Sequence, residues 1–207
     1  MNPINLKCNN LSHSFYGKKL FKDVNLDLSA GDSLAITGKN GSGKSTLLKL
    51  ISNLIRPSSG KVIILMNGNE VKKEDHYKYM GMSAPYISLY DELSGLENLE
   101  FFSSLKDYSL SEIESLLKSA GIYDSRDKIV KNYSSGMKQR LKLCFSLIGS
   151  PDILMLDEPA TNLDIDGTMF VKKIADEQKK KGILIIATND PAEVELCTAK
   201  INIEDYK

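Results

Sequence analysis

A glycine-rich stretch with two lysines and two serines is the first part of the sequence that suggests a chemical role. It fits the spacing G-x-x-x-x-G-K-[ST] and lies between a short apolar run and an amphipathic segment. Glycines let backbone N–H groups turn toward phosphate oxygens, and the start of a helix adds a partial positive charge. We therefore predict a phosphate-binding loop. Its residues are Gly38, Lys39, Asn40, Gly41, Ser42, Gly43, Lys44, Ser45 and Thr46.

Two side chains of this loop suit nucleotide chemistry in particular. Lys44 would reach the β- and γ-phosphates of a nucleotide, and the Ser45 hydroxyl would ligate Mg²⁺. The alternative is a glycine-rich turn with a chance lysine. That alternative does not explain why every fixed position of the motif is matched and why both flanking elements have the expected type.

An apolar run that ends in two carboxylates predicts the second half of a nucleotide site. Ile153–Leu156 indicate a buried strand, with Asp157 at its exposed end and Glu158 next. A carboxylate at that end can hold the hydration shell of Mg²⁺, and Glu158 can polarise an attacking water as general base. Alone, such a run is often only a strand end, but downstream of a phosphate-binding loop it indicates nucleotide chemistry.

The elements that must position these groups follow from the hydrophobic pattern. Residues 4–9 and the alternating run Val24–Ser29 predict a small antiparallel sheet near the N-terminus. Ser33–Thr37 predicts the short strand that leads into the loop. The helix after the loop would bury Leu47, Leu48, Ile51 and Leu54.

The rest of the chain reads as helices followed by further strands. Capping boxes at Ser94 and Ser109 start two helices in the middle, and Ile183–Ala187 predicts another buried strand. The helix before that strand would bury Met169, Phe170 and Ile174. This order predicts an α/β protein with a mostly parallel sheet and an inserted helical lobe.

Composition excludes several classes of protein. The 207 residues, 42% of them hydrophobic and 26% charged, suit one globular domain. Because 27 basic residues balance 27 acidic ones, there is no electrostatic reason to expect a nucleic-acid partner. Cys8, Cys144 and Cys197 are too scattered for a zinc site or disulfide framework, so we expect buried thiols in a reducing compartment. There is no secretory signal at the start and no apolar run of membrane-spanning length.

A third motif, Tyr133–Arg140, precedes an amphipathic helix and reads YSSGMKQR. Here the chain resembles the ATP-binding cassette (ABC) family, whose signature is Leu-Ser-Gly-Gly-Gln followed by a basic stretch. Pro159 and Thr161–Asp164, which follow the two carboxylates, resemble the end of the family's Walker B motif and its D-loop. The motifs fall in the family's order over nearly the whole chain. The stretch Leu156–Gly167 is also faintly similar to cassettes of the haem-exporter type.

The resemblance implies a fold. Residues 1–207 would form a single ABC ATPase domain with a RecA-like P-loop NTPase core and an N-terminal antiparallel β subdomain. The core would comprise residues 1–84 and 146–207, and the α-helical subdomain would occupy about 85–145.

The resemblance also implies ATP and Mg²⁺ as cofactors and a role for single residues. Glu158 would activate water, with Lys44 as a further catalytic residue. Ser45 and Asp157 would hold the metal ion. Tyr16 would stack on adenine, although a strand-surface tyrosine is the alternative.

Two cassettes of this family sandwich two ATP molecules head to tail. Ser134 and Gly136 would therefore contact the γ-phosphate held by the opposite subunit, and Asp164 would lie at the dimer interface. The partner would be a second ABC subunit, either an identical copy or an unlike one.

Three departures from the family pattern bear on catalysis. Gly81–Tyr86 contains no glutamine where relatives have one, and Met137 interrupts the signature. Asn189 stands where relatives carry a catalytic histidine, and its amide can donate one hydrogen bond but cannot become cationic. These departures predict slow hydrolysis with ATP binding retained.

The resulting hypothesis is the ATPase subunit of a membrane transporter, which dimerises on ATP and drives a separate transmembrane permease subunit. It would be cytoplasmic and peripheral on the inner face of the membrane. The alternatives are a nucleotide-gated switch and a non-transport ABC protein with weak hydrolysis. The stretch between Lys44 and Ser134 lacks the sustained heptads of chromosome-maintenance types.

We expect structural roles for two of the remaining side chains and leave two possible roles open for an apolar set. His13 reads as a strand residue and His76 as a surface residue. An apolar set on the approach to the helical lobe would either pack that lobe or dock a short cytoplasmic helix of a membrane partner. Its members are Tyr86, Ile87, Leu89, Tyr90 and Leu93.

Overall fold

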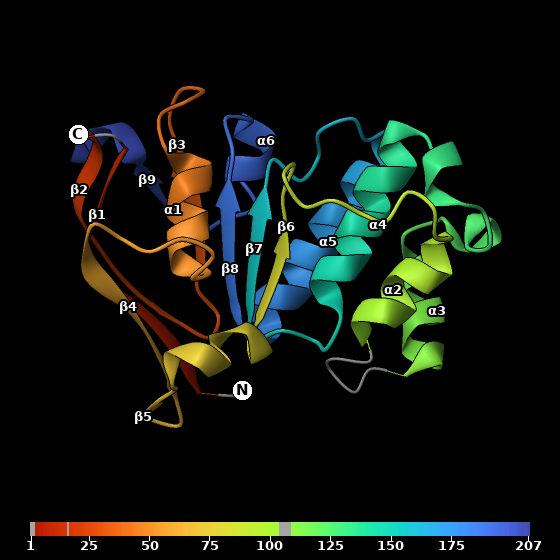
Figure 1. The fold of residues 1–207 in the computed structure, drawn as a ribbon, viewed down its shortest axis with the longest axis horizontal. Helices are drawn as coiled ribbons and strands as arrows, with labels where there is room; N and C mark the ends of the chain where they lie inside the picture. Colours follow the sequence, from red (N-terminus) through yellow and green to blue (C-terminus); the bar gives the residue numbers. More distant parts are fainter. Residues whose placement is uncertain (1–2, 16, 104–108) are drawn as a thin grey trace.

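A five-stranded sheet forms the centre of the structure, a computed structural model that describes residues 3–15, 17–103 and 109–207. The strand order is β6-β7-β8-β3-β9, and every neighbouring pair is parallel (Figure 1). The strands are β3 (Ser33–Thr37), β6 (Met80–Ser83), β7 (Ile153–Asp157), β8 (Ile183–Ala187) and β9 (Ala199–Asn202). The predicted α/β fold with a parallel sheet is confirmed.

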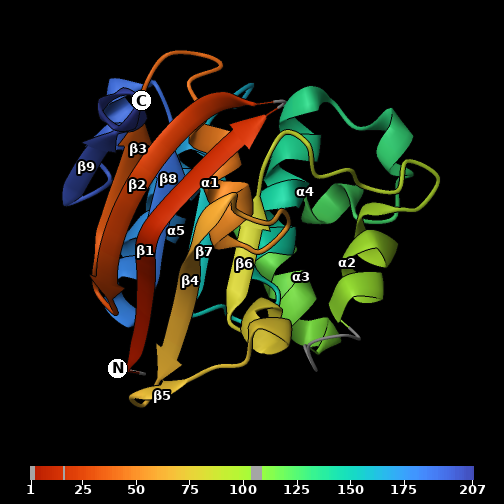
Figure 2. The ribbon, with the colours of Figure 1, turned by 60° about the vertical axis from the view of Figure 1, so that its left-hand side comes forward.

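A second, antiparallel sheet is built from the N-terminal part of the chain. Its order is β2-β1-β4-β5, with β1 paired to both β2 and β4. Figure 2 shows these long strands in front of the parallel sheet. They are β1 (Ile4–Phe15), β2 (Lys18–Ser29), β4 (Ser59–Met66) and β5 (Asn69–Glu70). The predicted N-terminal antiparallel sheet is therefore confirmed as well.

The helices cover both faces of the parallel sheet. Helix α1 (Lys44–Ile51) packs between the two sheets, whereas α4 (Ser135–Leu147) and α5 (Ile165–Lys181) cover the other face (Figure 1). Helices α2 (Gly95–Ser103) and α3 (Leu110–Ser119) lie beside α4. The short elements are α6 (Pro191–Val194) and four 3₁₀ helices, η1 (Lys73–Lys78), η2 (Tyr123–Ser125), η3 (Val130–Asn132) and η4 (Ile203–Tyr206). Within the described ranges, no helix has the length and apolarity to cross a membrane.

Side-chain alternation along β7 divides the core and aims the functional carboxylate. Ile153 and Met155 belong to the cluster around α1, whereas Leu154 and Leu156 belong to the cluster under α4 and α5. Because successive strand side chains point to opposite faces, Asp157 faces the α1 side. The period of the strand thus brings this carboxylate toward the start of α1.

Both predicted capping boxes are present. The Ser94 N–H donates to Glu97 Oε2 at 2.7 Å, and the Glu97 N–H donates to Ser94 Oγ at 3.2 Å. Ser109 and Glu112 make the same reciprocal pair at the start of α3. Each box satisfies N–H groups that the first helical turn leaves without a partner.

In each of two helices, one residue that was predicted to be buried is exposed. Helix α1 ends at Ile51, because Asn53 adopts a left-handed backbone with φ 60°, and Leu54 is 60% exposed. Met169 on α5 is 57% exposed, while Phe170 and Ile174 are buried. The buried stripe of α5 therefore runs one residue later than predicted.

His76 was predicted at the surface and is instead 3% exposed. Its Nδ1 lies 2.7 Å from Asn53 Nδ2, and its Nε2 lies 3.2 Å from the Val71 carbonyl oxygen. These two contacts satisfy both ring nitrogens of His76. The polar residues around His76 in the sequence gave no reason to expect a buried side chain. Burial lowers the pKa of His76.

The three cysteines are free thiols. Cys8 and Cys144 are buried as predicted, and Cys197 is half-buried. Burial raises the pKa of each thiol to about 12. Such thiols are unreactive, so they act as small apolar side chains.

Candidate functional site

The glycine-rich loop connects β3 to α1 and has the left-handed backbone that its glycines predict. Gly38, Gly41 and Gly43 have φ of 138°, 77° and 114°. A Cβ on Gly43 would lie 3.0 Å from Leu20 Cγ, so the loop passes too close to β2 for a larger residue. The Lys44 ammonium donates to the Gly38 carbonyl at 2.7 Å, which closes the loop around its own lysine.

A cavity of about 420 Å³ opens beside this loop. Its lining consists of Phe15, Leu20, Asn40, Gly41, Gly43, Lys44, Ser45, Thr46 and Glu158. Most residues of the predicted phosphate-binding loop therefore line the same cavity as Glu158. Lys39 lies at its edge, where its N–H donates to Glu204 Oε2 at 3.2 Å, and Ser42 is buried beneath it.

Phe15 and Leu20 are lining residues that the sequence analysis missed. Phe15 ends β1 and is 48% exposed, so it offers an aromatic surface at the cavity. Its ring packs edge-on against buried His13 with centroids 4.6 Å apart. An aromatic residue close before Gly17 in the sequence was the available signal. Tyr16 itself, the predicted adenine-stacking residue, lies outside the described residues.

Asp157 ends β7 as predicted, but its side chain is buried, with only 2% of the residue exposed. Burial raises the pKa of Asp157, and the Ser45 hydroxyl beside it acts in the opposite direction. Its Oδ2 has no hydrogen-bond partner among the described residues. A buried carboxylate oxygen without a partner next to a hydroxyl is a donor set that fits a hard divalent cation such as Mg²⁺.

These donors are too few to hold a metal ion alone. The part of the chain that the structure describes contains no cluster of three His, Cys, Asp or Glu residues suited to a metal. Mg²⁺ commonly keeps one or two protein ligands and completes its shell with water and substrate phosphates. The Ser45 and Asp157 pair therefore suits an ion that arrives with a nucleotide.

Glu158 lines the same cavity from the loop after β7. It adopts φ 49°, an uncommon backbone for a residue other than glycine. Its N–H donates to the Ala187 carbonyl at 2.9 Å, which continues the pairing of β7 with β8 by one residue. Backbone of this kind is frequent where a side chain must be aimed into a site.

Asn189 reaches the phosphate loop from the loop after β8. Its Nδ2 donates to Asn40 Oδ1 at 2.8 Å. The fold thus brings the predicted catalytic amide to the edge of the nucleotide cavity, although it is not one of the lining residues.

Glu193 is a third residue that the sequence analysis missed. It lies in α6, is 5% exposed, and its Oε1 accepts from the Ala160 N–H at 2.7 Å. Burial raises the pKa of Glu193, and the negative charges of Asp190 and Glu158 add to this effect. This acid ties the loop after β8 to the loop after β7. Nothing in its sequence context indicated a buried acid.

The signature residues lie away from the cavity. Ser134 caps α4, accepting from the Met137 N–H at 3.2 Å, and its side chain is exposed. A Cβ on Gly136 would approach the Asn162 carbonyl oxygen to 3.1 Å, so α4 begins in contact with the loop after Glu158. Neither Ser134 nor Gly136 lines the 420 Å³ cavity of its own chain.

Two further contacts join α4 to that loop. Gln139 Nε2 donates to the Pro159 carbonyl at 3.0 Å, and Arg140 forms an ion pair with Asp164. Asp164 also caps α5, accepting from the Gly167 N–H at 2.9 Å. The position predicted for a dimer interface therefore has structural partners within its own chain.

The segment that lacks the usual glutamine places an aromatic ring within electrostatic reach of Asp157. After β6 ends, Tyr86 packs its hydroxyl on Met82 Sδ at 3.7 Å. Lys49 Nζ from α1 lies 3.8 Å from the centroid of the Tyr86 ring. The Lys142 ammonium donates to the Pro85 carbonyl at 3.2 Å, which attaches the segment to α4.

Comparison with known proteins agrees with this geometry. Residues 21–161 match the family model described as ABC transporter. The chain is 35% identical over 191 residues to the lantibiotic transport ATP-binding protein SrtF of Streptococcus pyogenes, covering 92% of this chain and 82% of that protein. It is 32% identical over 197 residues to the ABC transporter ATP-binding protein NatA of Bacillus subtilis, covering 89% and 78%.

A solved structure leads to the same family. An ATP-binding subunit of an ABC transporter superposes with a TM-score of 0.84 at 26% identity, over 96% of this chain and 85% of that one. The phosphate loop, the carboxylate pair and the signature helix thus belong to one known architecture. The chain is a member of the ABC transporter family, an ATP-binding and ATP-hydrolysing subunit of the kind that drives transport.

Proposed function

We propose that this chain binds ATP with Mg²⁺ at the loop of residues 38–46 and hydrolyses it with Glu158 as general base. The observation that carries the proposal is the convergence of Lys44, Ser45 and Glu158 on one cavity, with buried Asp157 beside it. Hydrolysis would power a transporter through a second cassette and a membrane permease. On this basis the subunit works at the cytoplasmic face of a membrane.

The phosphate loop would bind by backbone and by charge. Its N–H groups and the start of α1 face phosphate oxygens, and Lys44 would exchange its contact with the Gly38 carbonyl for the β- and γ-phosphates. Ser45 and Asp157 would hold Mg²⁺, which neutralises charge on the phosphates. Phe15 offers an apolar surface for the base at the far side of the cavity.

Glu158 and Asn189 would act on the attacking water and the γ-phosphate. A carboxylate at the cavity wall accepts the proton that the water loses, a contribution of about 10²–10⁴ in rate. Asn189 would donate a neutral hydrogen bond in place of the cationic donor that the family usually has. We therefore retain the expectation of slow turnover.

A second cassette would complete each site. We assign residues of about 85–145 to the helical lobe and residues 1–84 and 146–207 to the core. On the lobe, exposed Ser134 and the start of α4 present a hydroxyl and a helix N-terminus to solvent. These groups suit a γ-phosphate presented by the core of another cassette.

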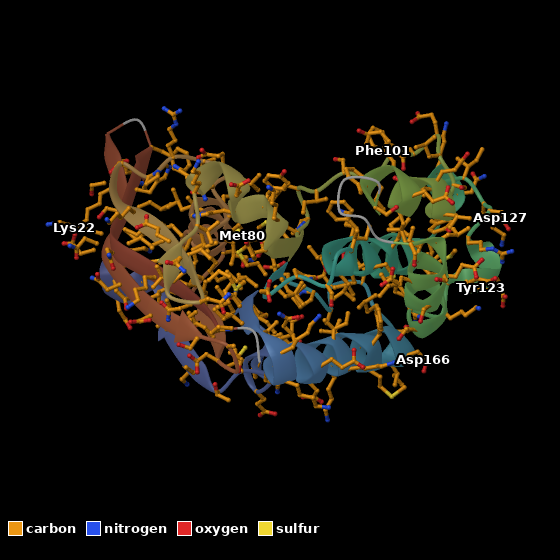
Figure 3. The ribbon with its side chains drawn as sticks, turned by 90° about the horizontal axis from the view of Figure 1, so that it is seen from below. Lys22, Met80, Phe101, Tyr123, Asp127 and Asp166 are labelled. Atoms are coloured by element: carbon orange, nitrogen blue, oxygen red, sulfur yellow. The ribbon has the colours of Figure 1, made fainter. Side chains whose placement is uncertain are left out.

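An apolar groove between core and lobe is the site we propose for the permease. Its volume is about 440 Å³, and it lies between β6 of the core and α2 and α4 of the lobe. Figure 3 labels Met80 on the core side and Phe101 on the lobe side. Its lining consists of Ser52, Leu54, Tyr77, Met80, Gly81, Met82, Ile87, Phe102, Phe145, Ile148 and Met155.

The occupant we propose is a short amphipathic helix on the cytoplasmic side of the permease. Leu54 and Tyr77 are 60% and 57% exposed at the rim, and together with the apolar lining they form a contiguous patch of the kind that marks an interaction site. The apolar residues for which the sequence left packing and docking open have different surroundings. Ile87 lines the groove, Leu89 packs into the lobe, and Tyr90 contacts the Phe101 ring at 5.4 Å.

Phosphate release by the purified protein with Mg²⁺ and ATP tests the proposal. Lys44→Ala should lose nucleotide binding, whereas Glu158→Gln should bind ATP, lose about 10²–10⁴ in turnover and accumulate as a dimer. Native mass and nucleotide binding are recorded for each variant. Turnover that survives Glu158→Gln would overturn the assignment of Glu158 as general base. A Glu158→Gln protein that binds ATP but stays monomeric would overturn the expectation that two copies of this chain form the dimer.

The docking groove needs its own test. Leu54→Glu places a charge at the rim without touching the nucleotide cavity. It should leave the ATPase of the isolated subunit unchanged and abolish co-purification with the cognate permease. Unchanged co-purification would place the permease contact elsewhere.

A further inference from the structure

Lys49 and Ser45 lie one helical turn apart on α1 and share a face of the helix. That face looks toward the end of β7, where the Ser45 hydroxyl and the Lys49 charge both lower the pKa of Asp157. The lysine is therefore a second positive group, besides Lys44, within electrostatic reach of the carboxylate proposed to hold Mg²⁺.

Lys49 is held by an aromatic ring in place of a carboxylate. Its Nζ lies 3.8 Å from the Tyr86 ring centroid, within the range of a strong cation–π contact. Among the ion pairs of the described residues, none involves this ammonium.

Tyr86 is itself fixed and neutral. Its hydroxyl contacts Met82 Sδ at 3.7 Å, and only 36% of the residue is exposed. Burial raises the pKa of Tyr86, and the negative charge of Asp157 raises it further. The Tyr86 ring therefore contacts the Lys49 ammonium and lies within electrostatic reach of Asp157.

The same surroundings create a competition for Asp157. Its Oδ2 is buried without a hydrogen-bond partner among the described residues, so any cation that reaches it gains a strong interaction. An ammonium on a flexible four-carbon stem is such a cation. Lys49 and Mg²⁺ are therefore rival partners for one oxygen.

We propose that Tyr86 is a positioning residue that keeps the Lys49 ammonium off Asp157 and so leaves this carboxylate free for Mg²⁺. The inference rests on the proposed metal site at Ser45 and Asp157 and adds to it a residue of the segment that lacks the family's glutamine. Removal of the ring releases Lys49, which then competes with the ion.

Binding of a fluorescent ATP analogue under Mg²⁺ titration tests this inference, in a Glu158→Gln background that prevents turnover. Tyr86→Leu keeps apolar bulk on Met82 but has no π face, and it should need on the order of tenfold more Mg²⁺ for half-maximal binding, as expected for a lost cation–π contact. Tyr86→Phe keeps the ring and should match the parent. Tyr86→Leu combined with Lys49→Met removes the competitor and should restore the parent's Mg²⁺ requirement.

The outcomes separate this inference from the site on which it rests. Analogue binding that ignores both Mg²⁺ and Asp157→Asn would overturn the metal site and the inference together. A parent that needs Mg²⁺ and Asp157, with a Tyr86→Leu variant that titrates identically, would overturn the inference alone. Loss of affinity in Tyr86→Leu that Lys49→Met fails to rescue would also overturn it, because the role of Tyr86 would then be packing. Urea unfolding midpoints for all variants verify that each is folded.

Discussion

Asn189 donates its Nδ2 hydrogen to Asn40 Oδ1 at 2.8 Å, so two asparagine side chains join the loop after β8 to the phosphate loop. An amide at this position holds a fixed, neutral donor at the rim of the nucleotide cavity. A histidine there could carry a positive charge near physiological pH. The hydrogen bond between Asn189 and Asn40 therefore couples the position of this neutral donor to that of the phosphate loop.

The first prediction concerns turnover at this position. Asn189→His should raise kcat by about tenfold, because a donor that can become cationic stabilises charge developing on the γ-phosphate better than an amide does. Asn189→Ala should lower kcat with little change in KM. Steady-state phosphate release measures both. A histidine variant no faster than the parent would remove Asn189 as the cause of slow hydrolysis.

Glu193 provides a prediction about stability. Glu193→Ala removes the acceptor of the part-buried Ala160 N–H and should cost about 1 kcal/mol of unfolding free energy, the usual net contribution of a hydrogen bond. Glu193→Gln keeps an oxygen for this N–H and removes a buried acid, so it should cost less. Urea unfolding of the three proteins checks the order. Equal losses in both variants would mean that the hydrogen bond contributes nothing.

His76 predicts a pH dependence of stability. Burial lowers the pKa of His76 below its ordinary 6.5, so the folded protein binds fewer protons than the unfolded chain in the window below that pH. Unfolding then takes up a proton, and the His76 contribution to stability falls as the pH drops through 6.5. His76→Gln has no such proton to take up.

The measurement is the unfolding free energy of parent and His76→Gln between pH 7.5 and 5.5. The parent should lose more stability than the variant over this range, and the difference between them isolates His76 from the other titrating groups. Lys73, Glu70 and Asp75 are the charged residues that also act on its pKa. Parallel curves for the two proteins would show that His76 titrates alike in the folded and unfolded states.

Local motifs made much of the site predictable from sequence. The residues of the phosphate loop are adjacent in sequence, and its glycines permit the positive φ angles that the loop adopts. Asp157 followed from the strand period, because an apolar run of known length aims its last side chain to a definite face. Both capping boxes depend only on residues three positions apart.

Contacts between segments that are far apart in the sequence could not be predicted by the same reasoning. Burial of His76 depends on Asn53, whose left-handed backbone also ends α1 early. Glu193 accepts a hydrogen bond from the Ala160 N–H, and Lys49 of α1 contacts the ring of Tyr86, which follows β6. Met169 was placed inside because one-residue rotations of a helix leave its sequence pattern nearly unchanged. The contacts of His76, Glu193 and Lys49 are tertiary and have no local signature in the sequence.

Gly43 tests whether the loop backbone itself binds phosphate. It combines φ 114° with a Cβ position 3.0 Å from Leu20 Cγ, so Gly43→Ala should abolish ATP binding and cost about 1–3 kcal/mol in strain. Gly68→Ala is the matched control, since Gly68 has φ 78° but open space around it and lies far from the cavity along β4 and β5. It should lose only stability. Nucleotide binding and urea unfolding separate the two effects, and ATP binding that persists in Gly43→Ala would contradict the assigned loop geometry.

Gly136 tests the completion of the site by a second cassette. The start of α4 approaches the Asn162 carbonyl so closely that a Cβ would lie 3.1 Å from it, and a side chain there would also project beside exposed Ser134. In a Glu158→Gln background, Gly136→Ala should bind ATP as a monomer with unchanged affinity but fail to form the ATP-trapped dimer. Ser135→Ala, one residue earlier, keeps the helix start and should still dimerise. Native mass spectrometry with ATP counts the species, and a Gly136→Ala dimer as abundant as the parent's would mean that the signature helix does not face the partner's phosphate.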